Sequence, residues 1–503
     1  MSNHLFDALT AFIPEPGKVF LETPEGSKLT YRDVLARSAQ YAGALQKLGV
    51  KPGDRVAVQV EKTPDALMVY LGTIRAGAVF LPLNTAYTPA EVAYFVGDAE
   101  PAVFVCDPQK ADALAGTAQK EGARLQTLNA RGEGTLRDLA DTMPEDFTTV
   151  AREDEDLAAI LYTSGTTGRS KGAMLSHGNL ASNSQTMVKV WRFTEDDVLL
   201  HALPIFHTHG LFVATNCLMM AGGSMLFLPK FDLDQVLALL PRATAMMGVP
   251  TFYTRLLASE AFTKDLVGHF RLFISGSAPL SAEVHRAFLD RTGHAILERY
   301  GMTETNMNTS NPYDGDRRPG TVGFPLPGVG LRIADPKTGR EVSPGEVGII
   351  EIKGPNVFQG YWRMPEKTSQ EFRVDGYFIT GDMGRIDEDG YVSIVGRSKD
   401  LIISGGFNVY PAEVEALLDE LPGVAESAVI GVPHPDFGEA VVAVLAAKPD
   451  SVLDEDTVLA PIRDRLAKFK QPKKVHVLEA LPRNTMGKIQ KNVLRDQFKG
   501  DFS

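Results

Sequence analysis

The sequence predicts an α/β protein with a large N-terminal domain of layered sheets and a small, mobile α+β domain at the C-terminal end. Two observations lead to this prediction. Helical and strand patterns alternate through the first 320 residues, which favours layers with largely parallel sheets. Near residue 320 the composition changes to Gly, Pro and short β-rich runs, and after residue 397 short helical and strand patterns return. A chain of 503 residues is also too long for a single compact core.

The N-terminal elements follow from local patterns. Thr30 and Asp33 have the spacing of a capping box, so a helix should begin there and stop at Gly49. The apolar repeat over 66–77 predicts a second helix. Short apolar and β-branched runs predict strands at 55–60, 78–83, 157–161, 198–202, 224–228 and 272–275.

The remaining elements define the predicted domain organisation. Within an N-terminal domain of residues 1–396, the β-rich runs 330–334 and 348–353 predict a small antiparallel sheet or barrel-like subdomain over about 320–396. Residues 397–400 form the predicted hinge, and 401–503 the C-terminal domain. In that domain helices are expected at 411–421 and 456–467, and strands at 425–432 and 440–447.

Composition excludes several classes of function. The formal net charge is -12 and no basic stripe is present, which argues against a nucleic-acid partner. Cys106 and Cys217 lie in different apolar contexts and are expected to be buried, reduced thiols, and no Cys/His cluster has zinc-site spacing. The most apolar window, 211–228, is interrupted by polar residues and glycines, so no membrane association is expected. No signal or transit peptide and no peroxisomal address is visible, so a cytoplasmic location is expected.

The segment 162–172, Tyr-Thr-Ser-Gly-Thr-Thr-Gly-Arg-Ser-Lys-Gly, is the most informative stretch of the chain. It follows the buried strand predicted at 157–161. A loop of Gly, Ser and Thr beside a lysine suits phosphate groups, because glycine lets backbone N–H groups turn inward while hydroxyls and an ammonium add donors. It departs from the P-loop, since Ser170 and Gly172 flank Lys171. The pattern therefore indicates phosphate binding outside the P-loop enzymes.

Five further segments have the composition of a ligand site. Residues 275–279 and 484–488 are Gly-containing loops, and the second contains Lys488. Residues 300–304 combine an aromatic ring, a glycine, a hydroxyl and a carboxylate, which suits a nucleotide with Mg²⁺. Residues 377–382 end a strand pattern with an acid that could accept both hydroxyls of a ribose, and 396–400 place basic groups where the two domains would meet.

In this order the segments resemble the acyl-adenylate-forming enzymes of the acyl-CoA synthetase type, and the resemblance covers about residues 20–491. It implies two steps with ATP and CoA as substrates and Mg²⁺ as cofactor. A carboxylate attacks the α-phosphate of ATP to give an acyl-adenylate and pyrophosphate, and a thiol then displaces AMP. It also implies that the C-terminal domain rotates between the steps.

The resemblance assigns roles to individual residues. Lys488 would be catalytic, neutralising charge around the α-phosphate and the attacking carboxylate, and Glu304 would hold Mg²⁺. Lys399 would be the hinge residue, and Ser404, Gly405 and Gly406 would line the CoA tunnel. The residues expected around ATP are Thr163, Ser164, Gly165, Thr166, Thr167, Gly168, Lys171, Ser277, Ala278, Pro279, Glu298, Arg299, Tyr300, Gly301, Thr303, Asp382 and Arg397.

The resemblance also implies an acyl pocket between residues 206–210 and the helix after Pro279. Arg286 on that helix would be costly in an apolar pocket, whereas a second substrate carboxylate would pair with it. The pattern resembles the malonate- and methylmalonate-activating members of the family. This implies that Arg286 clamps the distal carboxylate and that His207 and Met302 contact the acyl group. Arg299 is expected to form a structural salt bridge rather than to touch the acyl substrate.

Three alternatives stay open at this stage. The substrate could be an apolar medium-chain or aryl acid. The chain could be an adenylation module that serves a free carrier protein or oxidises its acyl group. It could also be a non-catalytic relative, which the presence of Lys488, Glu304 and Asp382 argues against. Because the role of Lys488 is its charge, acetylation there should silence the enzyme, so a lysine acetyltransferase or deacetylase is an expected partner.

Overall fold

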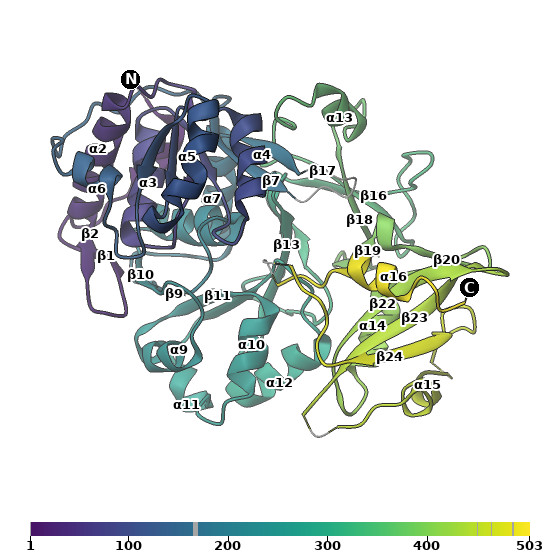
Figure 1. Ribbon diagram of the computed structural model, residues 1–503. Coiled ribbons are helices and arrows are strands. Elements are labelled where there is room, and N and C mark those ends of the chain that lie inside the picture. Colours follow the sequence, from purple (N-terminus) through teal and green to yellow (C-terminus); the bar gives the residue numbers. More distant parts are fainter. Residues whose placement is uncertain (1, 164–169, 450, 464, 485–486, 503) are drawn as a thin grey trace.

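The computed structural model describes residues 2–163, 170–449, 451–463, 465–484 and 487–502, and it has the predicted α/β architecture (Figure 1). Two large sheets with their helices make up the N-terminal part, a small antiparallel sheet follows, and a fourth sheet lies near the C-terminus. The α-helices of the described residues are α1 (His4–Thr10), α2 (Tyr31–Lys47), α3 (Pro64–Arg75), α4 (Pro89–Ala99), α5 (Ala111–Lys120), α6 (Thr135–Ala140), α7 (His177–Val190), α8 (Asn216–Ala221), α9 (Leu233–Leu239), α10 (Pro250–Leu257), α11 (Lys264–Val267), α12 (Ala282–Thr292), α13 (Pro365–Gln370), α14 (Pro411–Asp419), α15 (Glu455–Arg463) and α16 (Lys491–Phe498).

The first large sheet has six strands: β3 (Arg55–Gln59), β4 (Val79–Pro82), β5 (Val103–Cys106), β6 (Arg124–Thr127), β7 (Leu157–Thr163) and β8 (Lys171–Ser176). Their order is β6-β5-β3-β4-β7-β8, with only the β7–β8 pair antiparallel. The segment around Ser164 that connects β7 to β8 lies outside the described residues. The expected phosphate loop therefore begins at the end of β7, and Lys171 begins β8.

The second large sheet has nine strands: β1 (Val19–Glu22), β2 (Lys28–Thr30), β9 (Val198–His201), β10 (Ser224–Phe227), β11 (Ala245–Gly248), β12 (Leu272–Ser275), β13 (Leu297–Met302), β14 (Asn306–Ser310) and β15 (Phe324–Pro325). Its order is β15-β14-β13-β12-β11-β9-β10-β1-β2. The central strands are parallel, and the pairs at both ends are antiparallel. The carboxyl ends of β9, β12 and β13 therefore lie at one edge of the sheet, where ligands of open α/β sheets usually bind.

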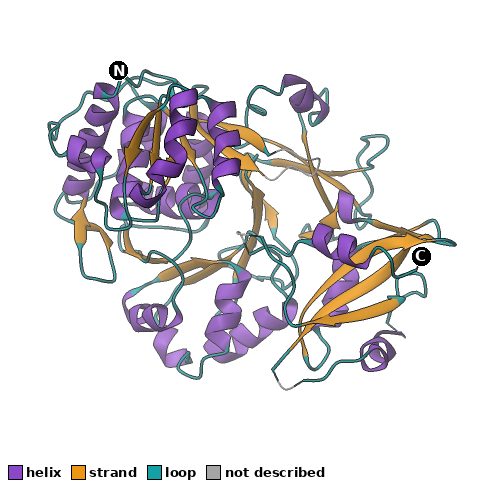
Figure 2. Cartoon of the chain, viewed as in Figure 1, coloured by secondary structure: helices purple, strands orange, loops and turns teal. Residues whose placement is uncertain are grey.

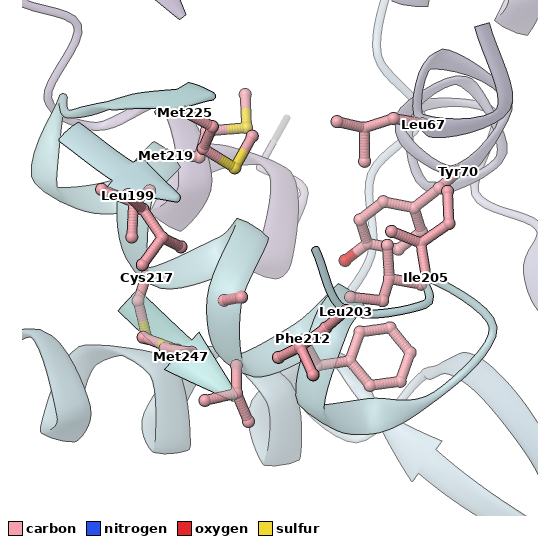
Figure 3. Close-up of a cluster of buried hydrophobic side chains, with 14 of the residues drawn as sticks. Leu67, Tyr70, Leu199, Leu203, Ile205, Phe212, Cys217, Met219, Met225 and Met247 are labelled. Carbon is pink, nitrogen blue, oxygen red and sulfur yellow. The ribbon is translucent and has the colours of Figure 1, made fainter. Parts of the chain in front are cut away.

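Helix α3 lies in the core of the N-terminal part, with every residue from Asp65 to Arg75 buried. A helix that is apolar on nearly all sides is a core helix. Its Tyr70 ring centre lies 5.9 Å from that of Phe212 and 5.2 Å from that of Phe80, so α3 contacts β4 and the helical segment that follows β9. Figure 3 shows this cluster, where Leu67 and Tyr70 face Leu203, Ile205 and Phe212. The segment that carries the expected acyl-binding residues therefore rests on a rigid apolar base.

The small sheet, β16 (Gly330–Ala334), β17 (Gly348–Lys353), β18 (Phe378–Ile386) and β19 (Val392–Arg397), is antiparallel in sequence order. It is an open sheet rather than a barrel, since β16 and β19 are its two edges. Strand β18 continues past Asp382, where the sequence pattern predicts its end, and the pairing shifts at Met383. Asp382 therefore lies within a paired strand, a more rigid position than a loop.

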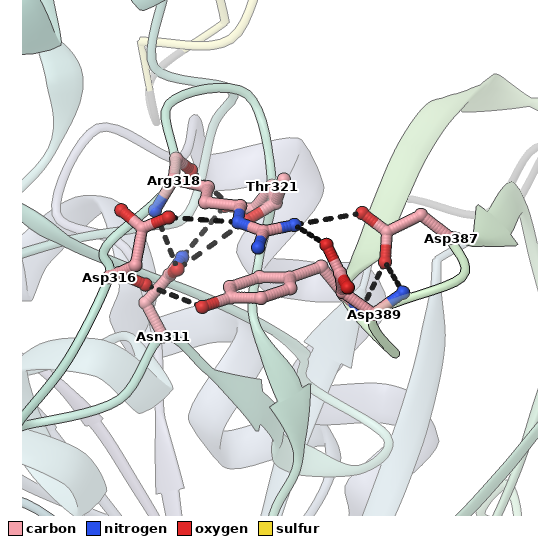
Figure 4. A network of polar contacts seen from close by, with 7 residues as sticks. Asn311, Asp316, Arg318, Thr321, Asp387 and Asp389 are labelled. Carbon is pink, nitrogen blue, oxygen red and sulfur yellow. Dashed lines mark hydrogen bonds and ion pairs between the residues drawn. The ribbon is translucent and has the colours of Figure 1, made fainter.

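A charged network ties this small sheet to the loop after β14 (Figure 4). Arg318 lies 2.8 Å from Asp389 and 2.9 Å from Asp316, and its guanidinium is 4.0 Å from the centre of the Tyr391 ring. The backbone N–H of Arg318 donates to the side chain of Asn311, whose own N–H donates to the carbonyl of Glu298 on β13. This chain of contacts holds β13 in a fixed relation to β18 and β19.

The C-terminal sheet consists of β20 (Ile402–Ser404), β21 (Phe407–Val409), β22 (Val424–His434), β23 (Gly438–Ala447) and β24 (Lys474–Leu478). Alternate residues of β23 face two small cores: Val441 and Ala443 pack with α14 and α15, whereas Val442 and Val444 pack with α16. The turn Ser398–Asp400 connects β19 to this sheet, so the predicted hinge coincides with a short irregular segment. The exact domain boundaries stay predictions.

Figure 2 shows helices flanking the two large sheets. The C-terminal part meets α12 through the ion pairs Arg286–Glu420 and Glu283–Lys448. Within the described ranges, each helix is too short or too polar to span a lipid bilayer. Cys106 and Cys217 are buried and free.

Candidate functional site

The site lies where β13, the turn that follows it, β18, β19 and the loop before α16 come together. In Figure 1 the yellow segment before α16 runs back toward β13. Residues 164–168 of the expected phosphate loop lie outside the described residues. Of the other expected ATP-site residues, Ala278 and Pro279 are exposed, and Thr303 and Gly301 are half-buried.

The expected ribose end of the site is a compact polar cluster. The Tyr300 hydroxyl donates to Asp382 at 2.6 Å, and Arg397 lies 2.7 Å from the other Asp382 oxygen. Asp382 and Arg397 are partners across the β18–β19 pair, so the sheet register places them together. Burial raises the pKa of Tyr300, and the neighbouring Asp382 adds to this effect. The cluster therefore presents one carboxylate held by a neutral hydroxyl and a guanidinium.

Glu304 follows β13 and is buried among hydroxyl groups. Its carboxylate accepts from Tyr361 at 3.1 Å and from Thr163 at 3.4 Å. Burial raises the pKa of Glu304, and Lys171 opposes that shift. Lys171 itself lies 3.0 Å from Glu371 and 3.9 Å from the centre of the Tyr361 ring. Lys171 and Glu304 thus share Tyr361 as a common neighbour at the end of β7.

Two backbone features shape the cleft. A Cβ atom at Gly301 would come within 1.9 Å of the carbonyl oxygen of Asn306, so the turn from β13 into β14 requires glycine there. Ser277 has φ +70°, in the left-handed region that non-glycine residues rarely occupy. Strained residues of this kind concentrate at functional sites. The Ser277 hydroxyl lies 3.2 Å from Nδ1 of His209.

Lys488 enters the cleft from the C-terminal domain. Its loop is closed by hydrogen bonds with Asn484, one from the Lys488 backbone N–H at 3.0 Å and one to the Lys488 carbonyl at 2.9 Å. The side chain retains exposed surface, yet removal from bulk water lowers its pKa, as does the charge of Arg397, while Asp382 and Glu304 oppose the shift. The ammonium therefore lies within electrostatic reach of both expected nucleotide carboxylates.

The expected acyl side of the cleft contains two neutral histidines. Burial lowers the pKa of His207 to about 3, and the charges of Lys488 and Arg299 contribute. Burial also lowers the pKa of His209, with Arg299 the next cause. The Nε2 atom of His209 is buried without a hydrogen-bond partner. At neutral pH both rings are therefore uncharged, and each donates through one ring nitrogen and accepts through the other.

Arg299 is the most unusual residue of the site. Its side chain is 4% exposed, and its Nε and Nη2 atoms have no hydrogen-bond partner. The expected structural salt bridge is not formed, because no carboxylate of the described residues lies within 4.0 Å of the guanidinium. Burial lowers the Arg299 pKa to about 9, so the group is still a cation at neutral pH. A Cβ atom at Gly276 would meet the guanidinium at 2.3 Å, so glycine there makes room for it.

Arg286 is not in the cleft, contrary to the expectation that it clamps the substrate. Its side chain is 57% exposed and lies 3.9 Å from Glu420 of the C-terminal domain. The reason is helical geometry: consecutive side chains on α12 point about 100° apart, and the inward position belongs to His285. His285 is buried, and its Nδ1 atom lies 3.3 Å from Glu298. Glu298 makes this contact with His285, and its expected role at the ATP site stays a prediction.

Met302 and the expected CoA segment have simpler surroundings. The sulfur of Met302 lies 4.0 Å from the Tyr300 hydroxyl, so Met302 is beside the ribose cluster. Ser404 is buried, and Gly405 and Gly406 have φ +59° and +83° in the two-residue turn between β20 and β21. Figure 1 shows β20 on the outer side of the C-terminal domain, away from β13. Lys399 lies in the turn before β20, where burial lowers its pKa.

Sequence reasoning missed Tyr361 and Glu371, whose side chains share a hydrogen bond at 2.6 Å beside Lys171. The structure brings them to the site because Tyr361 bridges Ala173 on β8. This contact joins residues far apart in the sequence, and no local pattern around residue 361 indicates phosphate binding.

Comparison with known proteins gives a consistent family. The AMP-binding enzyme family matches residues 13–362, and the AMP-binding enzyme C-terminal domain matches residues 413–488. A malonate–CoA ligase from Arabidopsis thaliana is 35% identical over 502 residues, covering 93% of this chain and 82% of the plant protein. A feruloyl-CoA synthase from an Amycolatopsis species is 38% identical over 477 residues, covering 94% of each chain.

Among solved structures, ATP-bound MatB from Rhodopseudomonas palustris is 61% identical over 100% of both chains, with a TM-score of 0.98. The apo form of the same protein, also 61% identical and covering 100% of both chains, gives 0.88. This chain therefore superposes more closely on the ATP-bound structure than on the apo structure. The matched models cover both parts of the molecule, and the chain belongs to the AMP-binding enzyme family.

Proposed function

We propose that this protein is an AMP-forming acid–CoA ligase that converts malonate or methylmalonate to its CoA thioester through an acyl-adenylate. The single observation behind the choice of a dicarboxylate is Arg299, a buried cation whose Nε and Nη2 have no partner. An unpaired buried charge is costly, and a carboxylate can pair with a guanidinium through two hydrogen bonds. The second carboxylate of malonate supplies that partner, so substrate binding relieves a cost built into the pocket.

In the first step, one substrate carboxylate attacks the α-phosphate of ATP. The carboxylate is already ionised at neutral pH, so the step needs positioning and charge stabilisation rather than a general base. Lys488 supplies positive charge between the nucleotide cluster and His207. The neutral His207 and His209 line the acyl side without adding charge of their own. Lys488 is thus the catalytic cation, and Arg299 orients the substrate.

The nucleotide is held from the opposite side. Asp382 accepts the ribose hydroxyls, and Arg397 and Tyr300 keep its carboxylate in place through the bonds they already make. Tyr300, Gly301 and residues 277–279 contact the adenine. Lys171 and the loop after Thr163 take the β- and γ-phosphates, for which Lys171 exchanges its contact with Glu371.

The residues around Glu304 fit a magnesium ion that takes most of its ligands from phosphate. Glu304 is one buried carboxylate beside the hydroxyls of Thr163 and Tyr361, and the described residues contain no cluster of three or more His, Cys, Asp or Glu side chains suited to a metal. Mg²⁺ is usually held by one or two carboxylates plus substrate phosphates, where it neutralises phosphate charge. Glu304→Gln should raise the Mg²⁺ concentration needed for half-maximal pyrophosphate release, whereas Glu371→Gln should change it less.

The thioester step requires the C-terminal domain to move. In the present arrangement β20, which leads into the turn with Gly405 and Gly406, lies on the outer side of that domain (Figure 1), and Lys488 lies near Arg397, Asp382 and Glu304. Rotation about Lys399 withdraws Lys488 and brings this turn to the acyl-adenylate, where it borders the CoA path. Measuring thioester formation with CoA and no carrier protein tests the free carrier-protein alternative, because a product formed with CoA alone excludes a need for a carrier.

Lys488 is also a proposed control point. Acetylation removes its charge, so a lysine acetyltransferase would silence the first step and a deacetylase would restore it. Acetylating the purified protein chemically or enzymatically and mapping the modified lysine by mass spectrometry tests this, with pyrophosphate release measured before and after deacetylation.

An aryl acid is the second candidate, favoured by the 38% identity to a feruloyl-CoA synthase. One panel separates the two candidates: malonate, methylmalonate, succinate, propionate, octanoate and ferulate, each with ATP, Mg²⁺ and CoA, followed by AMP release. The proposal predicts the highest kcat/KM for malonate or methylmalonate. A higher value for octanoate or ferulate would replace it with the aryl or apolar assignment.

A further inference from the structure

A lysine outside the described site is buried without a carboxylate partner. Lys62, in the loop between β3 and α3, is 7% exposed. Its Nζ atom donates to Nδ1 of His201 at 2.9 Å and to the His201 carbonyl at 2.8 Å. The Nζ atom also lies 4.2 Å from the centre of the Phe227 ring, and burial lowers the Lys62 pKa well below its usual value. Both polar contacts of Lys62 thus go to one residue, at the carboxyl end of β9.

This contact sets the hydrogen-bonding state of His201. Burial keeps the His201 ring neutral by lowering its pKa, and the nearby Lys62 acts in the same direction. Because Lys62 donates to Nδ1, the ring proton is on Nε2, which then donates to the carbonyl of Gly210 at 2.8 Å. The Thr215 hydroxyl donates to the same carbonyl at 3.0 Å. A buried chain of donors therefore runs from Lys62 through His201 to Gly210.

Gly210 holds the segment that carries His207 and His209. The backbone reverses so tightly there that a Cβ atom at Gly210 would lie 2.1 Å from the Pro204 carbonyl oxygen. The N–H of Leu211 donates to the His207 carbonyl at 3.0 Å, and the N–H of His209 donates to Nδ1 of His207 at 3.3 Å. The following residues, His209–Thr215, form a π-helix, a conformation frequent at functional sites. Fixing the Gly210 carbonyl therefore fixes both histidines.

The apolar side of the same segment is covered separately. Figure 3 shows Leu203, Ile205 and Phe212 packed toward Tyr70 and Leu67 of α3. That packing sets the depth of the segment but not the direction of its carbonyl groups. A buried lysine adds nothing to such packing that leucine would not supply at lower cost, since burying an amine requires compensation by hydrogen bonds. The polar chain therefore has a role of its own.

We propose that Lys62 and His201 are positioning residues that aim His207 and His209 at the acyl substrate, through the hydrogen bond from His201 to Gly210. The inference rests on the proposed function, because it assigns those histidines to the acyl pocket. It predicts that weakening this chain of hydrogen bonds raises KM for the acid much more than KM for ATP. Lys62, His201 and Gly210 are not hydrogen-bonded to the residues assigned to ATP, and the segment that they position meets those residues at the contact between His209 and Ser277.

A matched pair of variants at His201 tests the direction of the bond. In His201→Gln the amide nitrogen takes the place of Nε2 and can still donate to Gly210. In His201→Asn the amide takes the place of Nδ1, so it keeps a partner for Lys62 but loses the donor to Gly210. We expect His201→Asn to raise KM for malonate about tenfold, the effect of one lost buried hydrogen bond, and His201→Gln to remain within about threefold of the wild type. KM for ATP should change by less than about twofold in both.

A second pair keeps the test decisive if a His201 variant folds poorly. Lys62→Gln retains an N–H donor for His201, whereas Lys62→Met has a similar shape and none, so Met should raise KM for malonate more than Gln. Melting temperatures by calorimetry identify folded variants. Equal KM for malonate within either folded pair, or KM for malonate and ATP rising together, would overturn the positioning role. A wild-type enzyme that does not use malonate would instead overturn the proposed function.

Discussion

The acyl pocket and the seam between α12 and the C-terminal domain are built in opposite ways. In the pocket, polar groups are buried with partners missing, as at Arg299 and Nε2 of His209. At the seam, charged groups are exposed and already paired: Glu283 lies 3.5 Å from Lys448, and Arg286 lies 3.9 Å from Glu420. All four seam side chains are between 38% and 57% exposed.

The difference matches the two tasks of the molecule. Buried, unsatisfied groups make the empty pocket costly and the occupied one favourable, which gives selectivity for a ligand that supplies the missing partner. Exposed ion pairs contribute roughly 0–1 kcal/mol each, so a domain held by them can leave its position without a large penalty. A rigid pocket and an easily broken seam are what a two-step reaction with domain rotation requires.

The largest effect on activity is expected at Lys488, which the C-terminal domain brings to the pocket. Lys488→Ala should slow pyrophosphate release about 10²–10³-fold, because charge stabilisation at the α-phosphate is lost. Thioester formation from supplied acyl-adenylate should fall by less than about tenfold. Single-turnover measurements of the two half-reactions check this, with Lys491→Ala as a neighbouring lysine control. Equal losses in both half-reactions would contradict the assignment.

An intermediate effect concerns Asp419, a carboxyl on the C-terminal side of the seam. Burial raises its pKa to about 7, the charges of Glu415 and Glu283 add to this, and its Oδ1 atom has no partner. The protonated form is therefore favoured in the folded state. The stability it contributes is fully present below the unfolded pKa of about 4 and is lost as the pH rises toward 7.

Asp419→Asn should accordingly be more stable than the wild type at pH 8, by an amount on the order of 1–3 kcal/mol, and equal to it near pH 4. Calorimetric melting temperatures across pH 4–8 measure the difference, with Asp436→Asn in an exposed turn as the control. A difference that is constant over this range would mean that the Asp419 carboxyl is ionised in the folded protein at all these pH values.

The smallest effect is expected at the seam itself. Arg286→Ala should slow the adenylation half-reaction by about two- to fivefold, leave KM for malonate unchanged and leave thioester formation unaffected, because it removes one exposed ion pair. Arg465→Ala is a matched control, since Arg465 pairs with the same Glu420 from within the C-terminal domain. Added salt should reduce the Arg286 effect. A large rise in KM for malonate in Arg286→Ala would contradict this account and would mean that Arg286 binds the substrate.

Much of the fold was predictable because it depends on local patterns. The capping box at Thr30 and Asp33 begins α2 as expected, and the strand predicted at 272–275 is β12 to the residue. Helix 411–421 is present as α14, although it ends at Asp419. These elements follow from side-chain periodicity and capping, which need no knowledge of distant residues.

The site was less predictable because its decisive features depend on long-range packing. The direction of Arg286 relative to His285 is set by which face of α12 meets β13, and the missing partner of Arg299 is visible only once every neighbour is placed. Lys62 and His201 are 139 residues apart in the chain, so no motif could join them. The oligomeric state and the compartment have no local signature either, and the cytoplasmic location stays a prediction.

The most direct test of the dicarboxylate account compares two substrates in two proteins. The ratio of kcat/KM for malonate to that for propionate, which lacks the second carboxylate, should be about 10³ or more in the wild type. In Arg299→Met it should fall to within about tenfold of one, because the cation that pairs with the second carboxylate is gone. A folded Arg299→Met enzyme that keeps the wild-type ratio would contradict the account.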